Sequence, residues 1–207
     1  MTLIRRWFLY GAVLFFVVGG TAILSLGSMG QAAESAKAYF AGGCFWCMEE
    51  AFEAVEGVVS VASGYMGGTV ANPTYAQVSG GGTGHAEAVE VMYDPQKVSY
   101  QELLDVFWRN IDPLTPNAQF CDHGTQYRSA VFYGTDDEKR LAEESRSAIE
   151  RSKKFSRPIV TELTKGSTFY QAENAHQDYY KKNPIRYKYY KFNCGRAKRL
   201  EILWGTP

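Results

Sequence analysis

Apolar positions recur along the chain with two periods, and they predict short strands alternating with amphipathic helices. Alternating or β-branched runs predict strands, whereas apolar residues three and four positions apart predict helices. The predicted strands cover residues 38–41, 58–65, 86–93, 129–133 and 158–163, and the predicted helices cover residues 45–55, 100–110, 136–154 and 173–182. This β-α-β, then β-α-β-α-β order predicts an α+β fold, a two-layer sandwich with a mixed sheet and helices on one face.

Two long segments between these elements show no hydrophobic period. Residues 66–84 and 111–127 are rich in glycine, asparagine and proline, and loops of that length in compact domains are usually functional or disordered. The tail beyond Ile185 is basic and aromatic, and its pattern predicts irregular structure. We therefore expect site residues on the long loops, which a rigid sheet would position.

The first 33 residues form a separate region. Arg5 and Arg6 precede an apolar run from position 7 to about 26, and small and polar residues follow it. This pattern is typical of an export segment, and the run approaches the ~20 residues that span a bilayer. Two outcomes stay open: a signal peptide cleaved near residues 31–33, or a membrane anchor over residues 7–26. Both would place a catalytic domain of residues 34–207 outside the cytoplasmic membrane, because the two arginines stay inside.

The charge balance excludes some classes of partner. The chain has 22 Lys plus Arg and 22 Asp plus Glu. Arg5 and Arg6 are the only charged residues among the first 33, so 20 basic and 22 acidic residues remain in the rest. This balance provides no basic footprint for nucleic acid and favours no polyanionic partner.

The most informative motif is Gly42-Gly43-Cys44-Phe45-Trp46-Cys47. Cys44 stands between a predicted strand and a predicted helix, and the N–H groups of a helix N-terminus favour thiolate over thiol. Phe45 and Trp46 would form an apolar wall beside it, and Cys47 brings a second sulfur one helical turn later. The motif predicts redox chemistry on an apolar or sulfur-containing substrate. The alternative is that these cysteines only fill space in the core.

The four cysteines are Cys44, Cys47, Cys121 and Cys194. In an exported protein two structural disulfides would be the default, but a domain of this size can bury a sufficient core without them. A zinc site would need Cys44, Cys47, Cys121 and His123, yet the bulky Phe-Trp pair at a helix start favours a dithiol. A thioredoxin-like Cys-x-x-Cys is the stronger alternative. A thioredoxin-like function would leave Glu87 and the two glycine-rich loops without a role. We expect no metal and no cofactor.

Glu87 is the second strong feature. The strand period places it on one face with Val89, Val91 and Tyr93. Because an ionised carboxylate is poorly solvated on an apolar face, the pKa of Glu87 should rise and make it a neutral proton donor near pH 7. The alternatives are that this face is solvated, or that Glu87 pairs with Arg128 or another base.

The loop over residues 122–128 is dense in polar side chains and leads into an apolar strand. Its Asp122 and Tyr127 are candidate site residues, while His123 is either a base or ligand or, more simply, an exposed loop histidine. Tyr75 is a further candidate in the other long loop, where it could instead be a packed aromatic.

Several motifs occur together and in order: Gly43-Cys44-Phe45-Trp46 with Glu49, Gly64-Tyr65, Gly67-Gly68, Asn72-Pro73-Thr74-Tyr75, Gly84-His85-Ala86-Glu87, Tyr93-Asp94-Pro95, Gly124-Thr125-Gln126-Tyr127-Arg128-Ser129 and Ala172-Glu173-Asn174-Ala175-His176-Gln177. With these motifs the chain resembles the A-type peptide methionine sulfoxide reductases, from about Lys37 to Asn193. The resemblance implies a ferredoxin-like two-layer sandwich. It also implies reduction of the S epimer of methionine sulfoxide, free or in oxidised proteins and peptides, to methionine, and we expect a monomer.

The resemblance also implies residue roles. Cys44 would be the nucleophile, and Phe45 and Trp46 would hold the substrate methyl group. Glu87 would protonate the sulfoxide oxygen, with Tyr75, Asp122 and Tyr127 in the surrounding hydrogen-bond set. Cys44 would become a sulfenic acid, a second thiol would condense with it, and a thioredoxin-like dithiol would reduce the resulting disulfide.

The chain departs from the better-known members in its cysteines. Those members carry glycine where this chain has Cys47, and a C-terminal cysteine resolves their sulfenic acid. Cys47 is within disulfide reach of Cys44 after one helical turn, and Cys194 in the tail is the other candidate. Cys121, next to Asp122, is a third candidate or a spare thiol. The sequence does not show which of these cysteines resolves the sulfenic acid.

Overall fold

The computed structural model of the chain describes residues 34–205. The predicted export segment lies outside these residues. Six strands form one sheet in the order β7-β6-β1-β3-β2-β8. Their bounds are β1 Ala36–Gly42, β2 Val58–Met66, β3 Ala86–Tyr93, β6 Ser129–Tyr133, β7 Glu162–Lys165 and β8 Tyr170–Gln171. Neighbouring strands are antiparallel except β6 and β7, which are parallel, so the predicted mixed sheet is confirmed.

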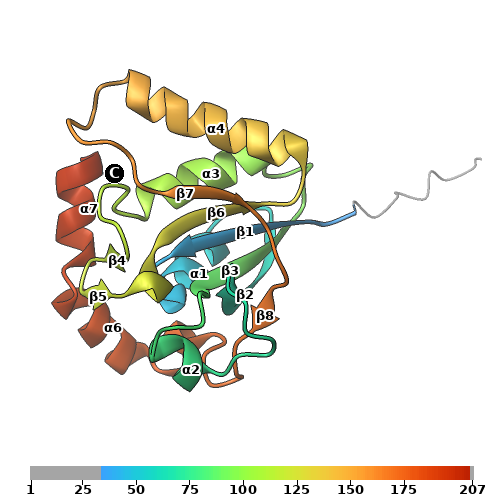
Figure 1. Cartoon of the computed structure of the whole chain (residues 1–207), viewed down its shortest axis with the longest axis vertical. Helices are drawn as coiled ribbons and strands as arrows, with labels where there is room; N and C mark the ends of the chain where they lie inside the picture. The colour runs from blue at the N-terminus through green and yellow to red at the C-terminus, as the bar shows by residue number, and fades with distance from the viewer. Residues whose placement is uncertain (1–33, 206–207) are drawn as a thin grey trace, which may run out of the picture. The chain divides into compact units, whose positions relative to one another are not determined.

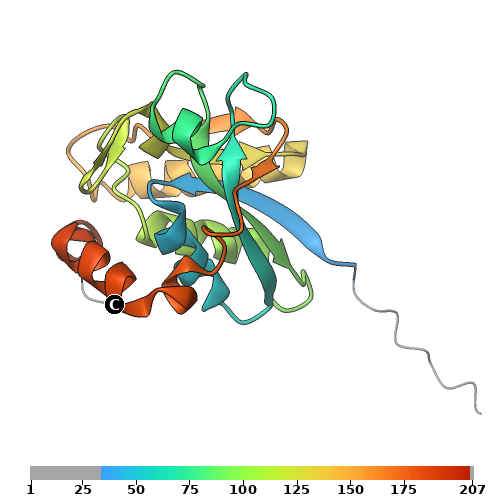
Figure 2. The ribbon, with the colours of Figure 1, turned by 90° about the horizontal axis from the view of Figure 1, so that it is seen from below.

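Three helices cover one face of this sheet: α1 Phe45–Glu53, α3 Tyr100–Arg109 and α4 Asp136–Arg151 (Figure 1, Figure 2). The chain order β1-α1-β2-β3-α3-β6, with β6 beside β1 and β3 between β1 and β2, is the ferredoxin-like arrangement. The core between the layers contains Phe40 of β1, Phe52 of α1 and Phe107 of α3. The α+β fold with helices on one face is therefore confirmed.

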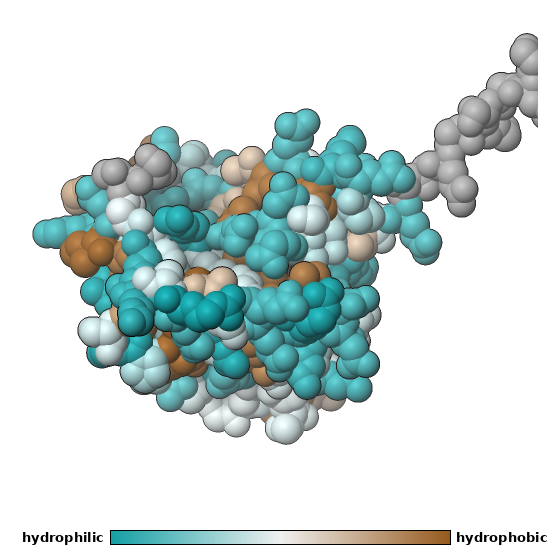
Figure 3. Space-filling model, turned by 90° about the horizontal axis from the view of Figure 1, so that it is seen from above, coloured by the Kyte–Doolittle hydropathy of each residue, from teal (hydrophilic) through white to brown (hydrophobic). Residues whose placement is uncertain are grey.

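Local sequence fixes where two of these helices begin. Ser99 and Thr135 each accept a hydrogen bond from the N–H three residues later, and the carboxylates of Glu102 and Glu138 each accept one from the N–H of the capping residue. These capping boxes satisfy N–H groups that a helix start would leave free. The exposed side of α4 is charged, and hydrophilic side chains cover most of the face on which it lies (Figure 3).

The long loops contain short elements that the sequence did not predict. Residues 66–84 include the one-turn helix α2, Tyr75–Ser79, and residues 111–127 include the hairpin of β4, Ala118–Gln119, with β5, Asp122–His123, followed by the turn η1, Thr125–Tyr127. None of these has a hydrophobic period of its own, because each packs through one or two side chains only.

The prediction of an irregular tail is wrong. The tail forms α6, Pro184–Asn193, and α7, Arg196–Trp204, and it buries Tyr187, Leu203 and Trp204. Lys and Arg residues interrupt its apolar positions, so the tail has no clear hydrophobic period. Its buried face can be identified only from the contacts that it makes with other segments of the chain. Among residues 34–205, none of the helices is both long and apolar enough to cross a membrane.

The largest differences from the predicted boundaries occur in two other elements. The helix predicted over residues 173–182 is reduced to α5, Tyr179–Lys182, because Glu173 accepts hydrogen bonds from the N–H of Tyr75 (2.8 Å) and the hydroxyl of Tyr65 (2.9 Å). The strand predicted over residues 158–163 begins four residues later, as β7.

Candidate active site

Cys44 lies at the tight turn between β1 and α1. Gly43 precedes it with φ of +79°, and a Cβ at this position would stand 2.4 Å from Cβ of Gln119, so only glycine fits. Cys44 is the capping residue of α1, and its carbonyl accepts the N–H of Cys47 at 3.1 Å. The side chains of Cys44 and Cys47 are 5% and 3% exposed and neither is in a disulfide.

Glu87 faces this turn from β3. It is 3% exposed and shares its buried face with Val89 and Val91, as the strand period predicts. Its Oε2 accepts the N–H of Phe45, the first residue of α1, at 3.1 Å. Burial raises the pKa of Glu87 to about 8, so the carboxyl is mostly neutral at pH 7. Arg128 does not pair with it, because the Arg128 Nε donates to Glu162 at 3.0 Å.

The predicted site residues meet around one small cavity of about 70 Å³. It is lined by Cys44, Phe45, Trp46, Tyr75, Glu87, Asp122, Tyr127 and Tyr190. This volume corresponds to roughly two water molecules. The cavity therefore has room for a small polar group that carries one methyl. The rest of a larger ligand would lie outside the cavity.

The apolar wall of the cavity is held by stacking. The Trp46 ring lies against Tyr179 with centroids 3.7 Å apart and planes 9° apart, and His176 stacks nearby at 5.8 Å. Phe45 contacts Trp46, with centroids at 6.2 Å. Aromatic pairs of this kind fix ring orientation as well as bury area, so Trp46 presents a defined surface to the cavity.

The two cysteines of α1 titrate as a pair. Burial raises the pKa of Cys44, and the hydrogen bond between Cys44 and Cys47 raises it further. The same hydrogen bond lowers the pKa of Cys47 to about 6, and the positive charges of Arg196 and Lys191 act in the same direction. Near pH 7 the pair therefore holds a single proton, which the two sulfurs share.

The phenols of Tyr75 and Tyr127 keep their protons. Burial and the nearby Glu87 raise the pKa of Tyr75 to about 12, and they raise that of Tyr127 as well. Both phenols are therefore hydrogen-bond donors at neutral pH. Burial also raises the pKa of Asp122, whose Oδ2 accepts the Tyr190 hydroxyl at 2.5 Å.

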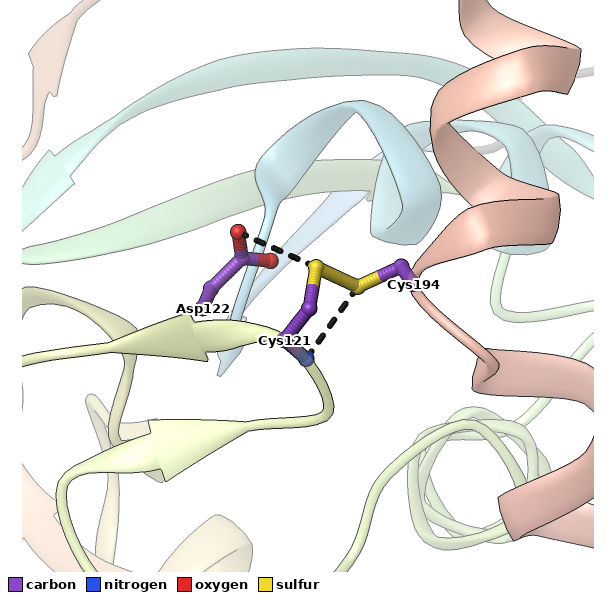
Figure 4. Close-up of side chains that lie close together, drawn as sticks. All are labelled: Cys121, Asp122 and Cys194. Carbon is purple, nitrogen blue, oxygen red and sulfur yellow. Dashed lines mark hydrogen bonds between the residues drawn. A yellow bond between two sulfur atoms is a disulfide. The ribbon is translucent and has the colours of Figure 1, made fainter.

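The other two cysteines form a disulfide. Cys121 and Cys194, 73 residues apart in the chain, are joined beside Asp122 (Figure 4). Of the two candidate resolving cysteines, Cys47 is thus a free thiol next to Cys44, whereas Cys194 is bonded to Cys121. The side chains considered for zinc do not come together, because Cys121 is in this bond and His123 is exposed.

The tail contributes site residues that the sequence pattern did not predict. Tyr190 lines the cavity, Tyr179 stacks on Trp46, and Tyr187 packs against Cys44 and Cys47. Positions 187, 190 and 194 follow helical spacing after Asn183-Pro184, a usual helix start. That spacing is the signal that could have found them.

The model of the peptide methionine sulfoxide reductase family matches residues 36–206 of the chain. The chain belongs to this family. The MsrA peptide methionine sulfoxide reductase of Halalkalibacterium halodurans is 50% identical over 169 residues, which are 82% of this chain and 96% of the relative. That of Listeria innocua is 45% identical and covers 81% of this chain and 95% of its own.

Solved structures agree in fold. Mxr1 of Saccharomyces cerevisiae in reduced form has a TM-score of 0.69 and 32% identity, covering 74% of this chain and 88% of its own. Methionine sulfoxide reductase A of Corynebacterium diphtheriae has a TM-score of 0.67 and 35% identity, covering 75% and 78%.

The chain is therefore a thiol-dependent oxidoreductase, a peptide-methionine (S)-S-oxide reductase. The alternative of a thioredoxin-like thiol–disulfide oxidoreductase is not favoured. The resemblance in the motifs between Lys37 and Asn193 is confirmed, because the family model covers that whole range.

Proposed function

We propose that this reductase uses Cys44 as nucleophile, Glu87 as proton donor and Cys47 as resolving thiol. The observation that carries the proposal is the cavity itself, in which a buried thiol and a buried neutral carboxyl face one small space. A sulfoxide sulfur is a poor electrophile until its oxygen is protonated or strongly hydrogen-bonded. The cavity holds both groups that this reaction needs.

In the first step the proton that Cys44 and Cys47 share lies on Cys47, which leaves Cys44 as the thiolate. The Cys44 thiolate attacks the sulfoxide sulfur while Glu87 protonates the oxygen. The S–O bond and the new S–S bond to the substrate then break as the hydroxyl passes to the Cys44 sulfur. Methionine leaves reduced by two electrons, Cys44 is a sulfenic acid, and Glu87 is a carboxylate.

The surrounding side chains would orient the substrate. Phe45 and Trp46 would hold the methyl group, and Tyr75 and Tyr127 would donate hydrogen bonds to the oxygen as its negative charge develops. Asp122 would complete this hydrogen-bond set by accepting the hydroxyl of Tyr190. These roles are supported by the shared lining of one cavity and by the protonated state of both phenols.

In the second step the Cys47 sulfur attacks the Cys44 sulfenic acid. An S–S bond forms, and the hydroxyl leaves as water with the proton of Cys47. Cys47 is supported over Cys194 because it is free, buried and hydrogen-bonded to Cys44, whereas Cys194 is already bonded to Cys121.

A dithiol partner would then return Cys44 and Cys47 to thiols and leave as a disulfide. We propose a thioredoxin-like protein for this step, because a protein disulfide is reduced by exchange with a second dithiol. The yeast relative Mxr1 has been crystallised with Trx2. The enzyme needs no further copy of itself in this cycle, and we propose that it acts as a monomer.

We also propose that the enzyme acts outside the cytoplasm. Arg5 and Arg6 before the apolar run support export, with residues 7–26 either cleaved off or kept as a membrane anchor. Fractionation of cells expressing the full chain separates these outcomes. A soluble extracytoplasmic product means cleavage, a membrane-bound one means an anchor, and a cytosolic one contradicts the proposal.

The cysteine roles are tested by locating the disulfides after one turnover. The reduced enzyme, freed of reductant, receives one equivalent of the S sulfoxide, is alkylated and is mapped by mass spectrometry. We expect a new Cys44–Cys47 disulfide. A bond between Cys44 and Cys194 would instead contradict the role of Cys47 and leave that of Cys44 intact.

A further inference from the structure

We propose that Tyr190 is a further catalytic residue of this enzyme, one that stabilises the attacking Cys44 thiolate, and that the Cys121–Cys194 disulfide positions it. The inference deepens the proposed function, since it rests on Cys44 as the nucleophile. The tail helix α6 is the last element of the chain to line the cavity.

One face of α6 covers the two reactive sulfurs. Tyr187 packs against Cys44 and Cys47, and Tyr190, one turn later, packs against the same cluster and lines the cavity. The opposite face points to solvent, and Tyr189 on it is 73% exposed. Neighbouring tyrosines of one helix therefore have opposite surroundings, and only one of them can act on the chemistry.

Tyr190 touches both sides of the cavity. Its hydroxyl donates to Asp122 Oδ2 at 2.5 Å, and its ring meets Trp46 edge-on, with centroids 6.0 Å apart. Its hydroxyl is also within hydrogen-bonding reach of the Cys44 sulfur, an interaction that lowers the pKa of Cys44 against the effect of burial. A hydroxyl has one proton, so Tyr190 donates it to Asp122 while Cys44 is a thiol and would turn it to the Cys44 sulfur once the thiolate forms.

The Cys121–Cys194 disulfide links the two segments that carry Tyr190 and Asp122. Cys194 follows Tyr190 by one helical turn, and its N–H donates to the Tyr190 carbonyl at 2.9 Å. Cys121 immediately precedes Asp122, and the Cα atoms of the two cysteines are 4.9 Å apart. Figure 4 shows the bond joining the α6 end to the Asp122 loop. The disulfide therefore fixes the distance between the two elements that carry Tyr190 and Asp122.

This position gives the disulfide a role separate from sulfenic acid resolution. The Cys121–Cys194 bond exists while Cys44 and Cys47 are both free, so it accompanies the reduced, substrate-ready enzyme. Without it, α6 would be tied to the Asp122 loop only by non-covalent contacts. Tyr190 would then spend less time against Cys44.

The test compares Tyr190→Phe with Tyr189→Phe in the full-length enzyme. Phenylalanine at 190 keeps the ring packing and removes only the hydroxyl, while the change at 189 alters an exposed neighbour of the same helix. Because a hydrogen bond to a charged group is removed, the first-turnover rate at pH 7 should fall about tenfold in Tyr190→Phe. Tyr189→Phe should match wild type.

The pH profile separates a catalytic from a merely structural role. The titratable groups around Cys44 are Cys47, Tyr75, Glu87, Asp122, Tyr127 and Tyr190. Loss of the Tyr190 hydrogen bond to the thiolate should move the rising limb of the single-turnover rate to higher pH by about one unit, the equivalent of tenfold. A purely structural change lowers the rate without moving that limb.

The disulfide is tested with the double variant Cys121→Ser, Cys194→Ser. Its first-turnover rate should fall, and adding Tyr190→Phe to it should lower the rate by less than in the wild-type background, because both changes act on one contact. Equal rates for Tyr190→Phe and Tyr189→Phe, or full additivity, would overturn the inference. Cys44→Ser keeps this separate from the proposed function, whose failure would appear as methionine formation by that variant.

Discussion

Substitution of the buried Glu87 should have two opposite effects. It should lower the rate of the chemical step and raise the free energy of unfolding. In Glu87→Gln the amide oxygen can still accept the N–H of Phe45, which is 3.1 Å from the carboxylate in the native chain. The variant therefore keeps the local hydrogen bond but has no acidic proton. Loss of a positioned general acid slows a chemical step by roughly 10²- to 10⁴-fold.

The stability effect follows from the pKa, which burial raises from 4.5 to about 8. The folded state then binds a proton that the unfolded state releases, so wild-type stability falls as pH rises between these two values. At about 1.4 kcal/mol per pH unit, the ceiling of this loss is about 5 kcal/mol. Glu87→Gln has no such proton, so its free energy of unfolding should rise relative to wild type from pH 5 to pH 8 and level off above.

Two measurements check this pair of effects. Single-turnover methionine formation from the S sulfoxide gives the chemical step, and urea unfolding from pH 5 to pH 9 gives the stability difference. Glu90→Gln is the matched control, since Glu90 is on the opposite face of the same strand, where it binds Lys37 and Tyr39. Wild-type turnover in Glu87→Gln would refute the proton-donor role. A stability difference independent of pH would refute the raised pKa.

Three further substitutions test other parts of the site. Cys47→Ser should still release the first methionine but should leave a sulfenic acid on Cys44 that dimedone traps, whereas rapid disulfide formation in that variant would assign resolution elsewhere. Trp46→Ala removes the ring that stacks on Tyr179 at 3.7 Å, and we expect a raised KM and a loss of roughly 3 kcal/mol in unfolding free energy; an unchanged KM would remove Trp46 from the substrate wall. Gly43→Ala places a Cβ 2.4 Å from Gln119 and should cost more stability than Gly81→Ala, which has a similar φ of +82° but nothing within 4 Å. Thermal unfolding of the two glycine variants measures this difference, and equal losses would contradict the clash.

The sequence was sufficient to predict those features that depend on residues close together in the chain. The period of one strand placed Glu87 among Val89 and Val91, and the glycine before Cys44 marked the turn that exposes a helix N-terminus. Both follow from residues within a few positions of each other. The strand and helix order likewise predicted the layers, because each element has its own apolar face.

The sequence was insufficient where contacts join distant segments. Four cysteines allow three pairings, and nothing near Cys121 or Cys194 indicates a bond across 73 residues. Tyr190 donates a hydrogen bond to Asp122, 68 positions earlier. Lysines and arginines dilute the apolar pattern of its helix, so the tail appeared irregular.

The most direct test of the central proposal is one turnover without reductant, with each sulfoxide epimer offered to the wild type and to Cys44→Ser. The wild type should release about one methionine per protein from the S epimer and none from the R epimer, since one thiolate supplies two electrons per cycle. Cys44→Ser should release none from either. Methionine from Cys44→Ser would contradict the role of Cys44, and equal yields from both epimers would contradict the assignment of the substrate.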